Sequence, residues 1–338
     1  MRGGVNTYPS PKMKIFSLIT VTLLIGVVSS APTENNLLTS FGKSETLPEK
    51  YVIYRGEYDI ANILLPINSL NSKKENSESD KESYEKPYIF FALADFTKGH
   101  NEDKGFYIRK NGEVTKLLDH GRDAATAMDG ISEVYIAAED GIYTYNPKNN
   151  TAEKYGIVTD DLIGIAKVNG SDIIYILTKN HVVYQVTDQG MKIDKVEDIV
   201  NPEQIVLDYE NNLYYVKNNN VNVFSPNGTK KIEGLPETIT YVKLIRPPLP
   251  LTNGVPVVVD HTVYIVFANG TSKLTNLNAT LRPTAYSLEG TVLLYLGHDK
   301  KIYEYNILAL ILDSMFSKFK EYLNGVVKGI EESFRIFR

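Results

Sequence analysis

The chain has 338 residues, with 36 basic and 41 acidic side chains, 43% hydrophobic residues and 23% charged residues. These proportions are ordinary for a globular protein, and the length suffices for one large domain or two small ones. There is no Cys, which excludes disulfides, thiol nucleophiles, Cys-ligated zinc and iron–sulfur clusters.

The N-terminal segment has the layout of a secretory signal peptide. Lys12 and Lys14 precede an uncharged run, Ile15–Val28, and small residues follow the run up to Ala31. As a helix, this run would be about 21 Å long at ~1.5 Å per residue, short of a hydrocarbon core of roughly 30 Å. We therefore expect residues 1–30 to be a signal peptide, and the protein to be secreted without a transmembrane span. The alternative is an uncleaved anchor.

The expected mature chain is acidic. Residues 1–30 contain three basic side chains and no acid, so their removal leaves 33 basic against 41 acidic residues, or −8. A diffuse negative charge argues against nucleic-acid binding, which needs a basic face. Secretion would also expose Asn-X-Ser/Thr sequons to glycosylation. The five sequons, expected in surface loops, are Asn149, Asn169, Asn227, Asn269 and Asn278.

A repeat with a period of about forty residues sets the predicted fold. Six strand-like segments that lead into a turn align at Phe106, Tyr143, Tyr184, Asn222, Tyr264 and Tyr303, with gaps of 37, 41, 38, 42 and 39 residues. Such a period is typical of propellers and solenoids. Each unit contains short β-branched and aromatic runs with Asn/Gly punctuation, and four strands per unit match one propeller blade. We predict an all-β, six-bladed β-propeller over residues 50–306, with an open solenoid as the alternative.

The two ends of the repeat suggest how the ring closes. The last unit stops near Asn306 without a fourth strand, whereas Lys50–Gly56 has a strand pattern and precedes the first unit. We predict that this N-terminal strand completes the last blade, because closure removes exposed sheet edges. Residues 31–49 would form an N-terminal segment. Residues 69–86 are polar and are expected to be a disordered loop excursion inside the first blade.

The C-terminal residues 307–338 depart from the repeat. Their apolar residues recur mostly three or four apart, which predicts an amphipathic helix. Such a helix could pack on the propeller, on a partner or on a lipid surface.

Blade topology groups the candidate binding residues on one face. In an up-and-down blade, the loop between the second and third strands shares a face with the connections between blades, and all five histidines, including His100, fall there. Arg282 lies in the connection into the last unit, and Arg246 lies near the first strand of the fifth. The candidate residues are His120, Arg122, His181, Arg246, His261, Arg282 and His298. Imidazole and guanidinium groups around a channel could bind a small anionic or aromatic ligand. The alternative is that they are solvated loop residues.

Catalytic motifs are weak. The sequence has no G-x-S-x-G and no H-E-x-x-H. Propeller hydrolases of the six-bladed type hold a calcium ion in the channel, but Asp129 and Asp208 here come beside tight turns, where an Asx-turn role is expected. We predict no catalytic residue, metal or cofactor. A calcium-dependent lactonase or esterase and an extracellular protein-interaction propeller remain alternatives.

Two units resemble a known family. The segments EDGIYTYNPKNNTAEKYG (Glu139–Gly156) and QIVLDYENNLYYVKNNNVNVF (Gln204–Phe224) are similar to ommochrome-binding proteins, which are secreted insect haemolymph proteins. The likeness covers roughly Tyr88–Asn306. It implies reversible, non-catalytic binding of phenoxazine pigments derived from tryptophan, or of related kynurenine-pathway compounds. The resemblance brings no site residues with it. These ligands are planar aromatics that bear carboxylates, which agrees with a face rich in His and Arg.

Overall fold

The computed structural model describes residues 47–66, 87–97, 101–128, 133–226, 228–248, 251, 253–278, 282–288 and 293–306. Several sequence-based predictions lie outside these residues: the signal peptide, most of the segment 31–49, the excursion 69–86, the C-terminal helix 307–338, His100, Asp129 and the sequon Asn227. Among the described residues, no helix is long and apolar enough to cross a membrane.

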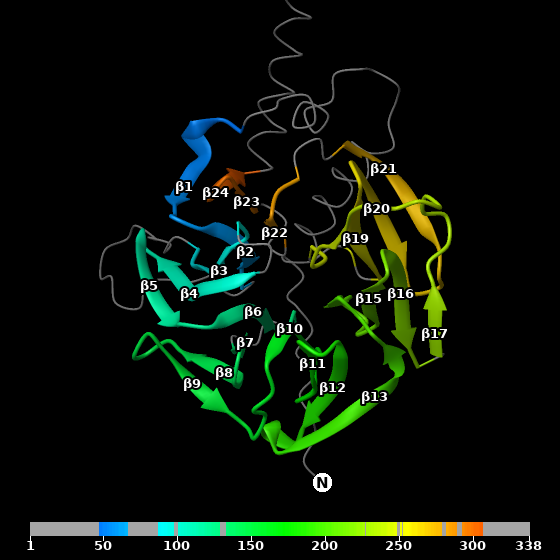
Figure 1. Ribbon diagram of the computed structural model, residues 1–338, viewed down its shortest axis with the longest axis horizontal. Coiled ribbons are helices and arrows are strands. Elements are labelled where there is room, and N and C mark those ends of the chain that lie inside the picture. Colours follow the sequence, from blue (N-terminus) through cyan, green and yellow to red (C-terminus); the bar gives the residue numbers. More distant parts are fainter. Residues whose placement is uncertain are drawn as a thin grey trace, which may run out of the picture.

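The described strands form six four-stranded antiparallel sheets arranged in a ring (Figure 1). Blade 1 consists, from inner to outer strand, of β2 (Asp59–Leu64), β3 (Ile89–Asp95), β4 (Glu102–Lys110) and β5 (Glu113–Leu118). Blade 2 consists of β6 (Gly121–Thr126), β7 (Val134–Ala138), β8 (Gly141–Asn146) and β9 (Thr151–Tyr155). Blade 3 consists of β10 (Leu162–Lys167), β11 (Ile174–Thr178), β12 (Val182–Thr187) and β13 (Lys192–Val200). The predicted six-bladed propeller is confirmed.

Blades 4 to 6 complete the ring in the same inner-to-outer order. Blade 4 consists of β14 (Gln204–Leu207), β15 (Leu213–Lys217), β16 (Asn220–Ser225) and β17 (Gly228–Lys231). Blade 5 consists of β18 (Val242–Leu244), β19 (Gly254–Val259), β20 (Thr262–Phe267) and β21 (Ser272–Asn278). Blade 6 consists of β22 (Ala285–Ser287), β23 (Leu293–His298), β24 (Lys301–Asn306) and β1 (Val52–Arg55). Two short 3₁₀ turns, η1 (Glu49–Tyr51) and η3 (Asp188–Gly190), flank strands.

The outermost strand of blade 6 comes from the N-terminal part of the described chain. Strand β1 pairs antiparallel with β24, with Val52 opposite Tyr303 and Arg55 opposite Lys301. Ahead of β1, the Tyr51 ring lies 4.4 Å from the Tyr305 ring, centroid to centroid.

Burial follows strand order within a blade. All five residues of β7 and all six of β19 are buried, whereas the outer strands β5 and β13 are mostly exposed. A second strand packs against neighbouring blades on both faces, which explains why these strands are continuous apolar runs in the sequence. The outermost strands are solvated on one side and carry polar residues.

Apolar clusters join neighbouring blades around most of the ring. One cluster joins each of the blade pairs 1 and 2, 2 and 3, 3 and 4, 4 and 5, and 6 and 1. Within the part of the chain that the structure describes, no such cluster joins blade 5 to blade 6. The seam between these two blades is instead lined by polar and aromatic side chains.

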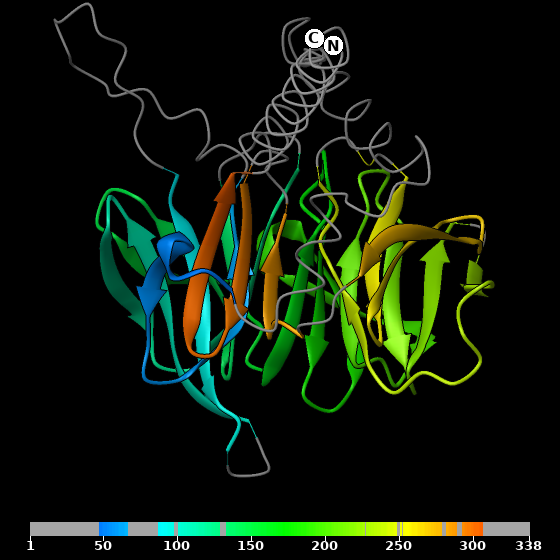
Figure 2. The same ribbon diagram turned by 90° about the horizontal axis from the view of Figure 1, so that it is seen from above.

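The antiparallel order gives the ring two distinct faces. We call the end where each inner strand begins the entry face; it carries the connections between blades and the β3–β4, β11–β12, β19–β20 and β23–β24 turns. The opposite end is the exit face. Figure 2 shows the ring from the side, with the cyan ends of β3 and β4 projecting from the entry face.

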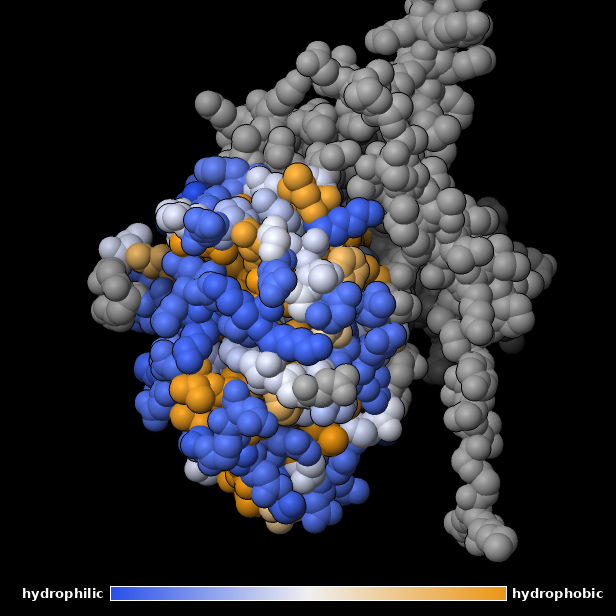
Figure 3. Space-filling model, turned by 90° about the vertical axis from the view of Figure 1, so that its right-hand side faces the viewer, coloured by the Kyte–Doolittle hydropathy of each residue, from blue (hydrophilic) through white to orange (hydrophobic). Residues whose placement is uncertain are grey.

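The outer surface is mostly hydrophilic. In the view of Figure 3, apolar residues form separate spots among hydrophilic ones. Among the described residues, the exposed large hydrophobic ones are Val114, Ile157, Met191, Val200 and Leu274.

Candidate functional site

The inner strands of blades 1 to 3 share an irregularity near their starts. The pairing register with the second strand shifts between Ile60 and Asn62 in β2, and between Gly121 and Asp123 in β6. Blade 3 has the same shift immediately before Gly164 in β10. A β-bulge of this kind re-aims the side chain that follows it. In each blade the residue after the shift lines a cavity in the central channel.

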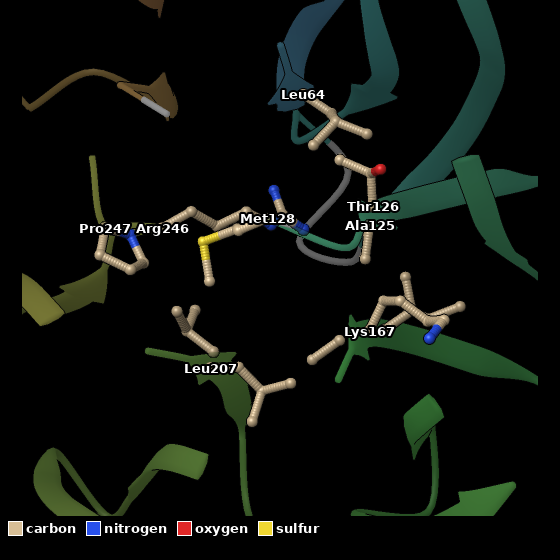
Figure 4. A pocket seen from close by; sticks show the side chains of 11 residues that line it. Leu64, Ala125, Thr126, Met128, Lys167, Leu207, Arg246 and Pro247 are labelled. Atoms are coloured by element: carbon tan, nitrogen blue, oxygen red, sulfur yellow. The ribbon is translucent and has the colours of Figure 1, made fainter. Parts of the chain in front are cut away.

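This cavity has a volume of about 90 Å³ and opens toward the entry half of the channel. Every inner strand contributes a residue to its wall: Asn62, Asp123, Gly164, Gln204, Lys243 and Tyr286. We call this space the channel cavity. A second, smaller space of about 30 Å³ lies nearer the exit face and is lined by Leu64, Met128, Leu207 and Pro247, among others (Figure 4).

Like Val206, Arg246 lines both spaces. Its Nη2 donates to Asp123 Oδ1 at 2.6 Å and to the Ala124 carbonyl at 2.6 Å, so that blade 5 is tied to blade 2 across the channel. The sequence placed Arg246 near the first strand of its unit. The structure shows that its backbone follows β18 toward the exit face and that its side chain enters the channel (Figure 4).

The Asp123 carboxylate is surrounded by donors. Besides Arg246, Oδ1 accepts from Asn62 Nδ2 at 2.5 Å and from the Ala124 amide at 2.7 Å, and Oδ2 accepts from the Ile165 amide at 3.0 Å. Only 6% of Asp123 is exposed. A buried carboxylate is tolerated when it is paired and hydrogen-bonded in this way.

Lys243 supplies a further positive charge to the channel cavity. Burial lowers the pKa of its ammonium group; the Arg246 cation acts in the same direction, and Asp123 acts against it. Within the described residues, no carboxylate or carbonyl accepts a hydrogen bond from Lys243. Because Asp123 is already paired with Arg246, and Glu203, the other acid of the cavity wall, is exposed, no carboxylate of the described residues pairs with Lys243.

The mouth of the channel at the seam between blades 5 and 6 combines a cation with aromatic rings. The Arg282 guanidinium lies over the Tyr241 ring, 5.1 Å from Cζ to the centroid, and its Nη2 donates to His261 Nε2 at 3.4 Å. Tyr241 lies directly before β18 and Arg282 lies three residues before β22, so both belong to the entry face near the channel. Asp260 holds this segment in place, because its Oδ1 accepts from the Tyr241 amide at 3.0 Å.

Tyr286 connects the mouth to the channel cavity. It lines the cavity and lies close enough to Tyr241 for the two phenols to influence each other's ionisation. Burial raises the pKa of the Tyr286 hydroxyl. This hydroxyl is buried and has no hydrogen-bond partner among the described residues.

Other predicted site residues serve contacts within the protein. Arg122, with a side chain 16% exposed, donates from Nε to Asp103 at 2.6 Å, from Nη1 to the Leu162 carbonyl at 3.0 Å, and pairs with Asp161. This network links blades 1, 2 and 3 at the entry face. Because two carboxylates and a carbonyl already accept from the guanidinium, we do not include Arg122 in the proposed ligand site.

The remaining histidines lie on the entry face, as the blade topology requires. His120 is exposed and pairs with Glu139, with Nδ1 3.4 Å from Oε2. His181 donates from Nδ1 to the Pro202 carbonyl at 2.8 Å, which ties its turn to the next connection. His298 ends β23. The structure thus brings together His261 and Arg282, while Arg246 joins a separate group deeper in the channel.

Four residues of this region were not predicted from the sequence: Asn62, Lys243, Tyr241 and Tyr286. The only clue was a charged or amide residue inside an otherwise apolar first strand, as in YVKLIR at Tyr241–Arg246. Asp208 behaves as predicted for an Asx turn, because its Oδ1 accepts from the Glu210 and Asn212 amides. Among the described residues there is no group of three or more His, Asp or Glu placed to hold a metal ion.

Comparisons with known proteins add no family. No family model matches the sequence, and no curated protein matches it. Among solved structures, the chain is similar to U3-55K, at 12% identity and a TM-score of 0.49 over 75% of this chain and 79% of that one. It is also similar to a structural genomics protein of unknown function from Bacteroides thetaiotaomicron, at 11% identity and a TM-score of 0.47 over 75% and 70%.

A further match is an extracellular domain from B. thetaiotaomicron, at 10% identity and a TM-score of 0.46. It covers 77% of this chain but only 42% of that chain, so the present chain spans less than half its length. At such low likeness, none of these structures bears on function, and the propeller rests on the strand pairing described above.

Proposed function

We propose that this protein is a secreted, non-enzymatic propeller that binds a small aromatic anion at the entry mouth of its channel. The ligand class is that of ommochrome pigments or kynurenine-type compounds, as the sequence resemblance implies. The observation that carries the proposal is the stacking of Arg282 on Tyr241 at the seam between blades 5 and 6.

The chemistry of the mouth supports this ligand class. A planar aromatic ring can stack on a guanidinium or a phenol, and a carboxylate can accept charge-assisted hydrogen bonds from arginine. Below the mouth, Lys243 and Arg246 face the channel cavity, and Asp123 balances only one of these two charges. The Lys243 ammonium, which has no carboxylate partner among the described residues, would therefore favour an anion in its immediate surroundings, although the chain as a whole is acidic.

Secretion and ring closure belong to the same proposal. The run Ile15–Val28 would direct the chain to an extracellular fluid such as haemolymph, and the sequons Asn149 and Asn269 are exposed. We propose that β1 closes the ring as the fourth strand of blade 6. The amphipathic segment 307–338 would pack on the propeller, a partner or lipid.

Tyrosine emission provides a direct test, because the chain has 23 Tyr and no Trp. The secreted chain is titrated with 3-hydroxykynurenine and with xanthommatin, and quenching is followed to saturation. We expect micromolar binding, and an Arg282→Met variant should bind roughly 10- to 100-fold more weakly, the range for a hydrogen bond to a charged group.

The control for this test is Arg55→Met on the outer strand β1, an exposed arginine paired with Glu49. It should bind as the wild type does. The absence of quenching by both compounds at ~100 µM would remove the proposed function, since a carrier is expected to bind at micromolar concentrations or below. Equal affinity in the Arg282 variant would remove the proposed mouth.

A further inference from the structure

Two residues that line the channel cavity, Lys243 and Tyr286, each carry a side-chain donor without an acceptor among the described residues. Most other polar groups in its wall are satisfied: Asp123 accepts four hydrogen bonds, Gln204 Oε1 accepts from the Leu244 amide at 3.1 Å, and Gln204 Nε2 donates to the Val242 carbonyl at 3.2 Å. Among the described residues, the exceptions are the Lys243 ammonium and the Tyr286 hydroxyl. Buried donors are normally paired in folded proteins, so each unpaired one calls for an explanation.

The charges around Lys243 leave it without compensation. Asp123 is neutralised by Arg246 at 2.6 Å. The other acid in the wall, Glu203, is exposed at the rim, where its Oε1 accepts from the Asn218 amide at 2.9 Å. Lys243 is therefore a partly buried cation beside an open space, with no carboxylate of the described chain in contact. An unpaired charge of this kind costs folding free energy unless a counter-ion is supplied.

We propose that a singly charged anion, either chloride or a carboxylate group, binds in the channel cavity with Lys243 as its counter-charge and the Tyr286 hydroxyl as a hydrogen-bond donor. One uncompensated positive charge matches one negative charge on the ligand. The two observations are independent, since one concerns charge on blade 5 and the other an unsatisfied hydroxyl on blade 6.

The size of the cavity limits what enters. A water molecule needs roughly 10–15 Å³ of such space, so about 90 Å³ holds a small anion with a few waters but no fused aromatic ring system. The carboxylate of an aromatic acid would therefore enter the cavity while its ring stays at the mouth, near Tyr241 and Arg282. Binding of such a carboxylate in the cavity rests on the proposed function, whereas binding of chloride does not depend on it.

Chloride is the probe for the first arm of the test. In chloride-free buffer, the wild-type protein should broaden the ³⁵Cl resonance of added sodium chloride through exchange with a bound site. Lys243→Met keeps the apolar stem and removes the charge, and it should abolish the broadening or weaken binding at least tenfold. Lys230→Met, an exposed lysine on β17, is the matched control and should behave as the wild type does.

Benzoate is the probe for the second arm. Displacement of chloride by benzoate identifies a carboxylate as an occupant, whereas Lys243-dependent broadening that benzoate leaves unchanged identifies chloride as the occupant; either result supports the site. Tyr286→Phe removes one oxygen and should weaken chloride binding several-fold. It tests the site even if Lys243→Met fails to fold. Broadening that is absent in the wild type, or unchanged in Lys243→Met and Tyr286→Phe, overturns the proposal.

The two proposals fail separately. Quenching by 3-hydroxykynurenine together with Lys243-independent chloride behaviour keeps the proposed function and removes the anion site. Lys243-dependent chloride binding without any quenching keeps the anion site and removes the proposed function.

Discussion

Arg246 and Asp123 form an ion pair across the central channel, with 2.6 Å between Nη2 and Oδ1. The two residues are 123 positions apart in the sequence and belong to blades 5 and 2. Most neighbouring blades are held together by apolar clusters, but this pair joins blades that are not neighbours. It therefore bridges the channel at the level of the cavity.

We expect Arg246→Met to destabilise the protein by about 3–5 kcal/mol, because it leaves the Asp123 charge buried without its cation. Asp123→Asn in the same chain should recover part of the loss, since the amide removes the uncompensated charge. Urea unfolding of the two single variants and the double variant measures the coupling. Arg55→Met, which breaks an exposed pair with Glu49, is the control and should leave the free energy of unfolding nearly unchanged. Additive single effects would show that the pair does not tie the two blades.

Arg122 should act on stability before it acts on binding. Arg122→Met removes contacts to Asp103, Asp161 and the Leu162 carbonyl, which join three blades. A loss of about 2–3 kcal/mol is expected, with a fall in melting temperature of roughly 5–10 °C. Scanning calorimetry measures the stability, and tyrosine quenching at a temperature where the variant is folded measures the affinity. A stable variant with lost affinity would return Arg122 to the ligand site.

Lys243 should make stability depend on pH in alkaline solution. Folding lowers the pKa of this group below its unfolded value, so the unfolded chain binds more protons in the pH range between the two values, and stability rises with pH there. In chloride-free buffer, Lys243→Met should be more stable than the wild type near pH 7, by roughly 1.4 kcal/mol per pKa unit of the shift. The advantage should shrink as the pH approaches 10.5. Urea unfolding at a series of pH values measures it, and a constant difference would contradict the assignment.

The fold was predictable from the sequence because its determinants are local. In blades 1 to 5 the third strand leads into a tight turn, and residues such as Asn111, Asn150 and Gly270 take the positive φ that these turns require. Asn and Gly therefore recur with the blade, and the period of about forty residues follows. The continuous apolar second strands have the same local origin, because both of their faces are covered by other blades.

The channel site was only partly predictable because its determinants are not local. Counting alternate loops placed His261 and Arg282 on one face, and the structure brings them into contact. Asp123 and Lys243 look in the sequence like other charged residues. The position of Asp123 depends on the bulge at the start of β6, and both positions depend on the ring that brings blades 2 and 5 opposite each other. The ion pairs of Arg122 could not be predicted for the same reason, since its partners Asp103 and Asp161 come from adjacent blades.

Removal of β1 tests ring closure. A chain that begins at Tyr58 lacks the strand that pairs with β24 and the Tyr51 ring that packs on Tyr305. Compared with a chain that begins at Leu47, it should lose at least about 2–3 kcal/mol, the contribution of one buried large side chain. It should melt roughly 5–10 °C lower and aggregate more readily, because β24 becomes an exposed edge. Calorimetry and light scattering measure both effects, and a synthetic peptide of residues 47–57 should restore stability. Equal melting of the two chains would rule out closure by this strand.

The sequons differ in how strongly an attached glycan would disturb the folded structure. The Asn169 side chain is part of a ladder on the exit face: its Oδ1 accepts from the Met128 amide at 2.7 Å and its Nδ2 donates to the Tyr209 carbonyl at 3.1 Å. A sugar attached to Nδ2 would restrict the geometry of this hydrogen bond and would need space between the neighbouring turns. Asn269 is exposed, and its Oδ1 accepts from the amide and the hydroxyl of Thr271, which belongs to the same sequon.

We therefore expect glycans at Asn149 and Asn269 and little or none at Asn169 in the folded, secreted protein. Peptide mapping after enzymatic deglycosylation in heavy-oxygen water measures the occupancy of each site. Asn169→Gln should cost about 1–2 kcal/mol, because two hydrogen bonds between turns of different blades are disturbed. Asn269→Gln is the matched control and should be close to neutral, since it lies at an exposed turn. Full occupancy at Asn169 in the folded protein would contradict the expectation that these contacts disfavour a glycan there.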